Sequence, residues 1–289
     1  MQIVTDTGTD VMLSVEEREA LNIHIIPLQV TLDGKSYREG VDITLADFYP
    51  LLEQSKNLPT TSQPSSGDFA ELYRELAAED PEILSVQISS GLSGTVNSAE
   101  AGAKQVPEAN ITIIDTKTLC VAAGWQVKAA AKAAKAGLAL DKIKDLIQSI
   151  SDASESIFTL KDLKYLIHGG RISHMKGLIA SVLNIKPQIG VEKENGTYVQ
   201  MGQSRTFKKS LEGLVGLMKK KHTPGSELLT QVMYSFNPTG GQMLCDIIDK
   251  TFKCSWLPME PMSLVLGAHT GPSMVGVAYA PVSILEHIQ

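Results

Sequence analysis

The sequence predicts an α/β protein of two domains, and three observations carry this prediction. The chain has 289 residues, 43% of them hydrophobic and 20% charged, which is enough apolar material for two cores of ordinary size. As far as residue 155, short apolar runs alternate with stretches of helical periodicity, which is typical of a right-handed parallel sheet. Farther along, an Asn195-Gly196 pair separates two apolar runs, a strong signal for an antiparallel hairpin. We therefore expect an N-terminal parallel α/β domain over residues 1–155 and a C-terminal α+β domain with a mixed or antiparallel sheet over residues 156–289.

The elements of the first domain are predicted from hydrophobic periodicity and from helix-start signals. Residues 2–5 read as a buried strand, and Ser14 stands where it can cap the helix that follows. Further strands are expected over residues 23–32, 83–88 and 111–115. Helices are expected over residues 14–21, 45–54, 68–78, 96–105, 122–136 and 141–151.

The second domain shows a different order of elements, in which strands more often follow one another. Strands are expected over residues 156–160, 186–192, 198–202, 228–234, 255–260, 263–266 and 275–279. Helices are expected over residues 161–167, 174–184, 207–220 and 240–252. In this scheme residues 267–272, Gly-Ala-His-Thr-Gly-Pro, form a loop between two apolar strands.

Charge and cysteine content narrow the class of protein. A formal net charge of −6 argues against a nucleic-acid partner, because proteins that neutralise phosphates normally carry a basic face. The three cysteines, Cys120, Cys245 and Cys254, have no ligand-like spacing, and an odd count does not suggest a disulfide framework. The first residues contain no apolar leader, and the longest apolar region is interrupted by His269 and Pro272. We expect a cytoplasmic protein without a transmembrane segment.

Two segments, both of which we expect to be turns, are rich in hydroxyl side chains. The first hydroxyl segment, residues 60–65, reads Thr-Thr-Ser-Gln-Pro-Ser, and the second, residues 89–95, reads Ser-Ser-Gly-Leu-Ser-Gly-Thr; each precedes a predicted helix. The free N–H groups of a helix's first turn favour a negatively charged ligand. Because one βα unit spans about thirty residues, both segments are expected at the same edge of the parallel sheet. Two interpretations are open: an anion-binding cup, and ordinary helix capping.

The hydroxyl segments supply hydrogen-bond donors but no acid, base or metal ligand. The closest approach to an enzyme motif is the Ser93 turn, which resembles a nucleophile elbow except that Thr95 stands where the motif has glycine. No phosphate-binding loop of the nucleotide-kinase type and no dinucleotide-binding fingerprint is present. The candidate ligand-binding groups are Thr61, Ser62, Ser93, Gly94 and Thr95, and no cofactor is implied.

Several charged or titratable residues outside these segments are further candidates. His269 is flanked by glycines and can hold a carboxylate or take up a proton, although a lone histidine is more often structural. Arg171 follows a glycine pair, and its fork of donors suits a phosphate or a partner's carboxylate; a surface ion pair is the alternative, as it is for Arg205. Asp6 and Asp10 follow the first strand, where turn and cap roles compete with magnesium binding.

Four segments taken together resemble the DegV family of bacterial fatty-acid-binding proteins. They are the two hydroxyl segments, residues 170–173 (Gly-Arg-Ile-Ser) and residues 267–272, in that order and at those separations. The resemblance covers essentially the whole chain. It implies a two-domain protein that holds one long-chain fatty acid in a tunnel between the domains. The bound acid would be presented to a separate fatty acid kinase, which makes an acyl phosphate for phospholipid synthesis.

The resemblance also implies roles for individual residues. Thr61 and Ser93 would bond the carboxylate, with Ser62 and the Gly94 backbone beside them, and His269 would complete the network. The two arginines, Arg171 and Arg205, would face the kinase, and transient contact with a membrane fits such a carrier. The competing hypothesis is an enzyme that acts on the acid itself, either a hydrolase using Ser93 or a phosphotransferase.

Overall fold

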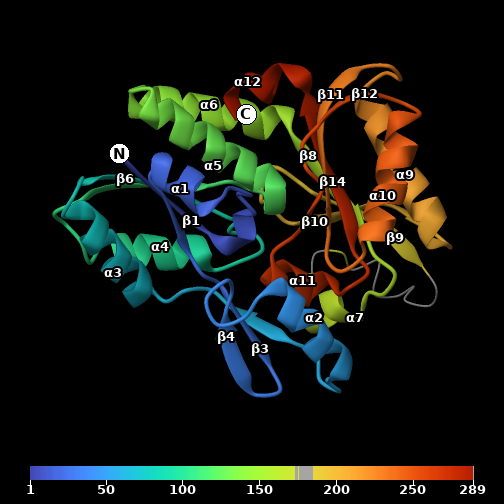
Figure 1. Ribbon diagram of the computed structural model, residues 1–289, viewed down its shortest axis with the longest axis horizontal. Helices are drawn as coiled ribbons and strands as arrows, with labels where there is room; N and C mark the ends of the chain where they lie inside the picture. The colour runs from blue at the N-terminus through green and yellow to red at the C-terminus, as the bar shows by residue number, and fades with distance from the viewer. Residues whose placement is uncertain (173–174, 176–184, 289) are drawn as a thin grey trace.

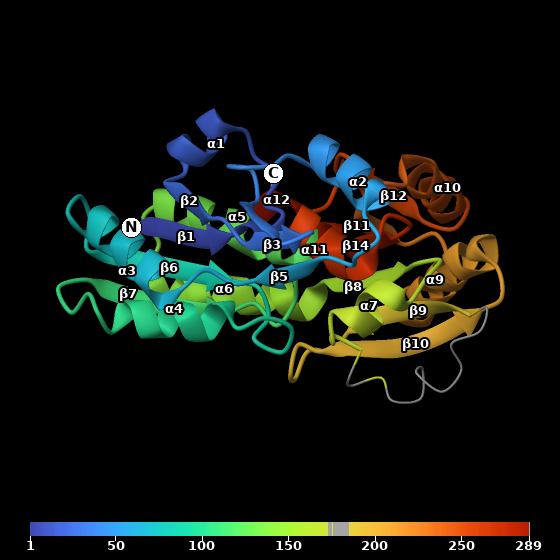
Figure 2. The same cartoon turned by 90° about the horizontal axis from the view of Figure 1, so that it is seen from below.

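The computed structural model of the protein describes residues 1–172, 175 and 185–288, which form three β-sheets and the helices around them (Figure 1). The first sheet is parallel, and the carboxyl ends of its central strands point toward the middle of the molecule (Figure 2). Its strands lie in the order β2 (Ile23–Ile26), β1 (Gln2–Asp6), β6 (Glu82–Gln87) and β7 (Asn110–Asp115).

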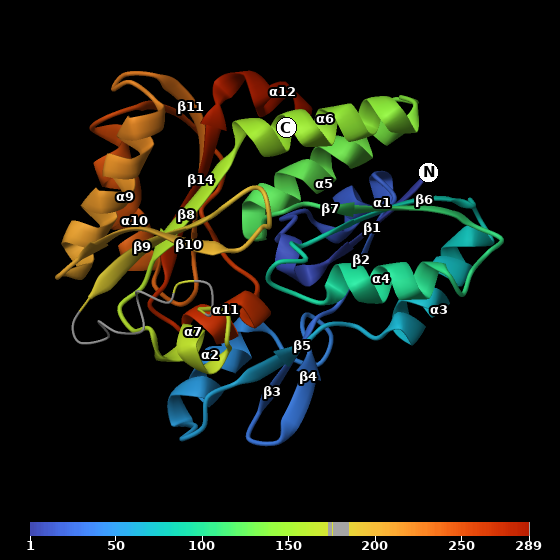
Figure 3. The same ribbon diagram turned by 180° about the vertical axis from the view of Figure 1, so that it is seen from behind.

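Two pairs of helices cover the two faces of the parallel sheet. Successive residues of a strand point to opposite faces, so the apolar run of β1 serves two cores, with Val4 in one and Ile3 in the other. The Val4 face is covered by α3 (Ser66–Ala77) and α4 (Thr95–Ala103), and the Ile3 face by α5 (Cys120–Lys135) and α6 (Leu140–Ala153) (Figure 3).

The second sheet is mixed and contains the hairpin predicted at Asn195-Gly196. The two strands of this hairpin pair antiparallel. Gly196, in the turn between them, adopts the left-handed φ of 66° that favours glycine. The strand order is β10 (Tyr198–Ser204), β9 (Lys186–Val191), β8 (Glu155–Thr159), β14 (Val275–Pro281), β11 (Glu227–Tyr234) and β12 (Lys253–Trp256), with β13 (Glu260–Pro261) also on β11. Its outer face is covered by α9 (Phe207–Lys221) and α10 (Pro238–Asp249).

A small antiparallel sheet and several short helices complete the described chain. The sheet has the order β4 (Lys35–Arg38), β3 (Gln29–Leu32) and β5 (Thr60–Ser62). The helices are η1 (Thr7–Thr9), α1 (Val15–Ala20), α2 (Leu45–Gln54), α7 (Lys164–His168), α11 (Leu264–Thr270), η2 (Val282–Ile284) and α12 (Leu285–Ile288). None of the helices within the described residues has the length and apolar character that a bilayer span requires.

The expected fold class is confirmed: a parallel α/β sheet in the N-terminal part is followed by a mixed sheet in the C-terminal part. β8 begins at Glu155, next to the proposed domain boundary. The largest core lies between the parallel sheet and the mixed sheet, and it joins residues such as Leu28, Leu119 and Trp125 to Tyr198 and Leu266. The N-terminal and C-terminal parts of the chain therefore share one apolar core, and each face of the parallel sheet has a separate core.

Three predictions of local structure are wrong. The strand expected over residues 23–32 is two strands in different sheets, β2 in the parallel sheet and β3 in the small antiparallel sheet, with Pro27 between them. Residues 60–62 are a strand, because Thr60–Ser62 pairs with β3, a partner thirty residues upstream that no local pattern reveals. The predicted strand at residues 263–266 and the loop after it are instead the helix Leu264–Thr270. All seven of its residues are buried, and a helix that is apolar on every side lacks the periodicity that distinguishes it from a buried strand. The helix predicted over residues 174–184 lies outside the described residues.

Candidate functional site

The second hydroxyl segment lies at the carboxyl end of β6 and leads into α4. Ser93 Oγ and Thr95 Oγ1 are 2.7 Å apart, and Thr95 N donates to Ser93 Oγ at 3.3 Å. Thr95 is fully buried as the first residue of α4, whereas Ser93 is partly exposed. The buried Thr95 side chain therefore holds the Ser93 hydroxyl in position. Of the two hydroxyl groups, the one that a ligand can reach is that of Ser93.

The first hydroxyl segment reaches the same place from another sheet. Thr61 Oγ1, in β5, lies 2.7 Å from His269 Nε2, in the last turn of α11. The expected placement of both segments on one edge of the parallel sheet is therefore wrong, because only the second follows a strand of that sheet. The two segments meet at one cavity, where His269 of α11 contacts Thr61 and lines the same space as Ser93.

His269 is held as a neutral imidazole. Its side chain is 7% exposed, and burial, followed by the charge of Arg171 and then that of His168, lowers its pKa from 6.5 to about 3. Nδ1 has no hydrogen-bond partner in the described structure, and it packs against Gly169 so closely that a Cβ at that position would collide with it. At neutral pH the ring is an uncharged partner for the Thr61 hydroxyl, and the close approach requires glycine at residue 169.

A cavity of about 30 Å³ lies beside these hydroxyls. A second cavity of about 20 Å³ lies between the mixed sheet, α11 and the start of α5, and is bounded in part by Cys120, Phe158 and three methionines. Leu119, Tyr198 and Leu266 line both cavities. The first cavity has a mixed lining: its polar members are Ser62, Gln63, Ser93, Arg171 and His269, and its apolar members include Leu28, Ile88, Leu92 and Val265.

Arg171 is among the residues that line the first cavity. Its Nε donates to Leu92 O at 3.2 Å and its Nη1 to Gly169 O at 2.7 Å, and burial lowers its pKa. The guanidinium thus ties the glycine break after α7 to the second hydroxyl segment. Arg205 is exposed in the turn between β10 and α9 and is not among the residues that line the cavity.

The carboxyl oxygens of Asp6 and Asp10 accept hydrogen bonds from backbone N–H groups. Asp6 accepts from Gly8 N at 2.8 Å and from Ile88 N at 2.9 Å, and Asp10 accepts from Ser263 N at 2.8 Å. Within the described residues, no group of three or more His, Cys, Asp or Glu side chains has the geometry to hold a metal ion. Of the two interpretations from the sequence, the geometry supports the turn and cap role.

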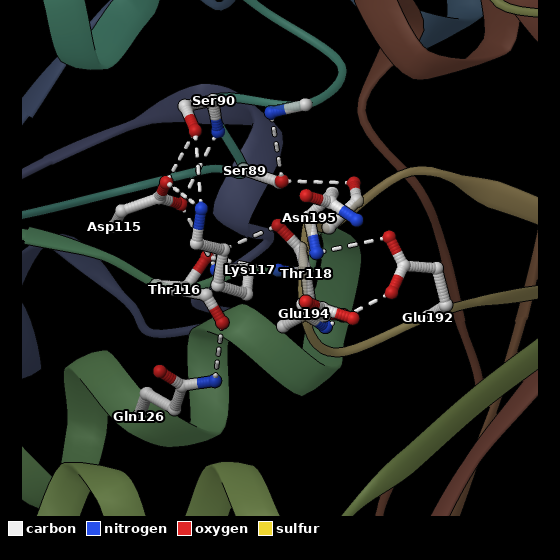
Figure 4. A network of polar contacts seen from close by, with 12 residues as sticks. Ser89, Ser90, Asp115, Thr116, Lys117, Thr118, Gln126, Glu192, Glu194 and Asn195 are labelled. Carbon is white, nitrogen blue, oxygen red and sulfur yellow. Dashed lines mark hydrogen bonds and ion pairs between the residues drawn. The ribbon is translucent and has the colours of Figure 1, made fainter. Parts of the chain in front are cut away.

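A polar network holds the start of the second hydroxyl segment (Figure 4). Ser89 Oγ donates to Gly196 O, at the tip of the β9–β10 hairpin, at 2.8 Å. Asp115, at the end of β7, accepts from the Ser90 hydroxyl and from Lys117 N. The loop that carries Ser93 is therefore fixed by contacts from both large sheets.

The structure brings together most of the residues predicted for the site and adds others. Ser62, Ser93, Arg171 and His269 line one cavity, and Thr61 contacts His269. Gln63, which sequence analysis passed over although it lies in the first hydroxyl segment, packs over Gly94: a Cβ on this glycine would come within 2.8 Å of Gln63 Nε2. The apolar wall carried no sequence signal, because its residues are scattered over both parts of the chain.

Comparison with known proteins identifies the relationship. The family described as "Uncharacterised protein, DegV family" matches residues 1–282. The chain belongs to the DegV family. A DegV domain-containing protein of Staphylococcus aureus (strain N315) is 33% identical over 286 residues, covering 95% of this chain and 96% of the relative. The resemblance drawn from the four motifs is thus confirmed at the level of the family.

Solved structures of other DegV proteins share this fold. One, described as showing fatty acid binding by a DegV family protein from Thermus thermophilus, superposes with a TM-score of 0.87 at 28% identity, covering 97% of this chain and 99% of that one. A stearic-acid-binding protein from Eubacterium ventriosum superposes with a TM-score of 0.83 at 26% identity, covering 97% and 98%. The matches extend over both large sheets and the segments between them.

Proposed function

We propose that this DegV protein binds one long-chain fatty acid, with the carboxylate at the Thr61–His269–Ser93 site and the acyl chain between the two large sheets. The observation that carries the proposal is that Ser93, Arg171 and His269, which contacts Thr61, line one cavity together with apolar side chains. Fatty acid binding by structural relatives that cover almost the whole chain supports it.

The site suits a carboxylate that hydroxyl groups hold in a cavity also lined by the Arg171 guanidinium. The Thr61 and Ser93 hydroxyls are assigned to the two carboxylate oxygens, with Ser62 and the Gly94 backbone beside them. Thr95 and His269 hold these hydroxyls at 2.7 Å contacts, which orients them before a ligand arrives. Because His269 stays neutral, its Nε2–H can donate to Thr61 Oγ1 and leave the Thr61 proton for the ligand.

The acyl chain supplies most of the binding free energy. Burying about fifteen methylenes at ~0.8 kcal/mol each offers roughly 12 kcal/mol, against ~1.5–3 kcal/mol for each bond to the charged head group. Association costs ~4–15 kcal/mol, so the hydroxyl site by itself would bind a short acid poorly. Its role is to fix the position of the carboxylate.

The acyl chain is proposed to run from the first cavity into the second, past the side chains that line both cavities. Each cavity has room for only one or two water molecules, so the chain enters when Leu119, Tyr198 and Leu266 move apart. Beyond these side chains lie Met233, Met262 and Met274. Methionine side chains are flexible and polarizable, which lets this end adapt to different chain shapes.

The proposed biological role is to present the carboxylate to a separate fatty acid kinase in the cytoplasm, which forms an acyl phosphate for phospholipid synthesis. Arg205 is exposed and is assigned to the kinase-facing surface; Arg171, which lines the first cavity, is placed where the partner would meet the head group. The protein itself is a carrier and not the catalyst.

The enzyme alternative receives no support from the geometry. The hydroxyl in contact with His269 is that of Thr61, while Ser93 contacts Thr95. A serine nucleophile requires a base within hydrogen-bond reach. The proposal therefore leaves Ser93 as a ligand-binding hydroxyl.

Native mass spectrometry of the purified protein tests the proposal directly. A bound C16–C18 acid is expected, and it should be lost on delipidation and regained on adding oleate. A protein that carries no lipid and ignores added C16–C18 acids would refute fatty acid binding. Incubation with ATP and oleate, with and without a fatty acid kinase, then distinguishes the carrier hypothesis from the enzyme hypothesis. Acyl phosphate formed by this protein alone would show that the protein itself is the catalyst.

A further inference from the structure

The first turn of α11 is held by carboxylates from the N-terminal part of the chain. Glu39 Oε1 accepts from Leu264 N at 2.6 Å, and Glu39 Oε2 accepts from Ser263 Oγ at 2.7 Å. Asp10 Oδ1 accepts from Ser263 N at 2.8 Å. Ser263 occupies the N-cap position, but its side chain makes no capping bond of its own. The N–H groups that a helix leaves unsatisfied at its start are therefore satisfied by residues more than two hundred positions away.

These contacts decide where α11 lies. A helix of seven residues is too short to be stable alone, so its position depends on tertiary contacts. Glu39 is 9% exposed, and burying a carboxyl group is costly unless its oxygens are hydrogen-bonded. At the other end of the same helix, His269 contacts Thr61, and Val265 and Leu266 line the first cavity.

We propose that Glu39 and Asp10 are positioning residues for the head-group site: they fix the first turn of α11 and thereby hold His269 against Thr61. The inference rests on the proposed function for its effect on fatty acid affinity. Glu39, which belongs to none of the sequence motifs, would thus affect ligand binding without contacting the ligand. Asp6 extends the same arrangement to the second hydroxyl segment, because it accepts from Ile88 N, one residue before Ser89.

The test compares two substitutions at one position. Glu39→Gln keeps an oxygen for Leu264 N and an amide that can donate to Ser263 Oγ, whereas Glu39→Ala removes both contacts. Thr206→Ala is the matched control, because Thr206 caps α9, on the outer face of the mixed sheet, by accepting from Lys209 N. Two quantities are measured: the Kd for oleate, and the His269 ring signals in histidine NMR spectra of the ligand-free protein.

Glu39→Ala is expected to raise the oleate Kd at least about tenfold and to shift the His269 signals. Glu39→Gln should leave both near their wild-type values, and Thr206→Ala should lower the melting temperature without changing either. Wild-type Kd and His269 signals in folded Glu39→Ala, or equal damage by Gln and Ala, would overturn the inference. If Glu39→Ala does not fold, Ser263→Ala, which removes one of the two Glu39 contacts, is expected to shift the His269 signals, and unchanged signals would overturn it.

The two proposals fail in different ways. If the wild-type protein binds no fatty acid, the proposed function is wrong, while the His269 signals of the ligand-free variants still decide whether Glu39 positions α11. If oleate binds but neither Kd nor signals respond to Glu39→Ala, the function stands and the positioning role is wrong.

Discussion

Thr61→Val tests the head-group site most sharply, because it removes one hydroxyl and leaves the shape of the side chain almost unchanged. Thr61 lies in β5, where a β-branched valine suits the strand. The substitution removes the 2.7 Å contact to His269 Nε2 and the donor assigned to the fatty acid carboxylate. The chain path between the sheets is untouched.

The expected effect follows from the charge of the ligand. A hydrogen bond to a charged group contributes ~1.5–3 kcal/mol, so the oleate Kd should rise roughly 10- to 150-fold. Methyl oleate has the same chain without the negative charge, and its Kd should change by about fivefold or less. The free energy of unfolding should fall by about 1–3 kcal/mol, because the buried His269 Nε2 loses its partner.

Calorimetric titration of the delipidated proteins with both ligands measures these quantities. Thr60→Val is the control, because Thr60 is the exposed neighbour of Thr61 in the same strand, whereas the contact to His269 is made by Thr61. An unchanged oleate Kd in folded Thr61→Val, or an equal loss for oleate and methyl oleate, would refute the assignment of Thr61 to the carboxylate.

Three further predictions concern stability, the chain path and the partner. Burial raises the pKa of Asp6 from 3.8 to about 7, so the free energy of unfolding should fall by up to about 4 kcal/mol as pH rises from below 4 through 7; Asp6→Asn should flatten this slope in urea titrations, and an unaltered slope contradicts it. Leu266→Trp should block the passage between the two cavities and raise the palmitate Kd at least about tenfold, whereas Leu138→Trp, at an exposed position, should leave the Kd unchanged. Equal palmitate Kd values for the two variants would contradict the proposed path of the acyl chain. Arg205→Ala should slow phosphorylation of bound oleate by a fatty acid kinase without changing the oleate Kd, and an unchanged rate would remove Arg205 from the kinase-facing surface.

The elements that the sequence predicted well are those with a local cause. The α2 helix, Leu45–Gln54, matches its predicted range because its pattern is amphipathic and Thr44 caps it. The β9–β10 hairpin follows from Asn195-Gly196, since few residues other than glycine adopt the φ that the turn requires. The four motifs, likewise, were sufficient to indicate the family.

The elements that were missed depend on partners far away in the chain. α11 looked like a strand because burial on every side leaves no periodicity, and β5 looked like a turn because its partner β3 lies thirty residues upstream. The placement of His269 beside Thr61 follows from both, so sequence analysis named the two residues without the contact between them.

The sequence by itself determined the order of the sheets, the family and the hydroxyl side chains available for a ligand, because each depends on residue type and short-range spacing. Only the tertiary structure decided which of those hydroxyls face a cavity, that His269 is neutral, and that Glu39 and Asp10 hold the helix that carries it. The physical reason is that burial and long-range hydrogen bonds are properties of the packed chain, and residues separated by two hundred positions leave no joint pattern in the sequence.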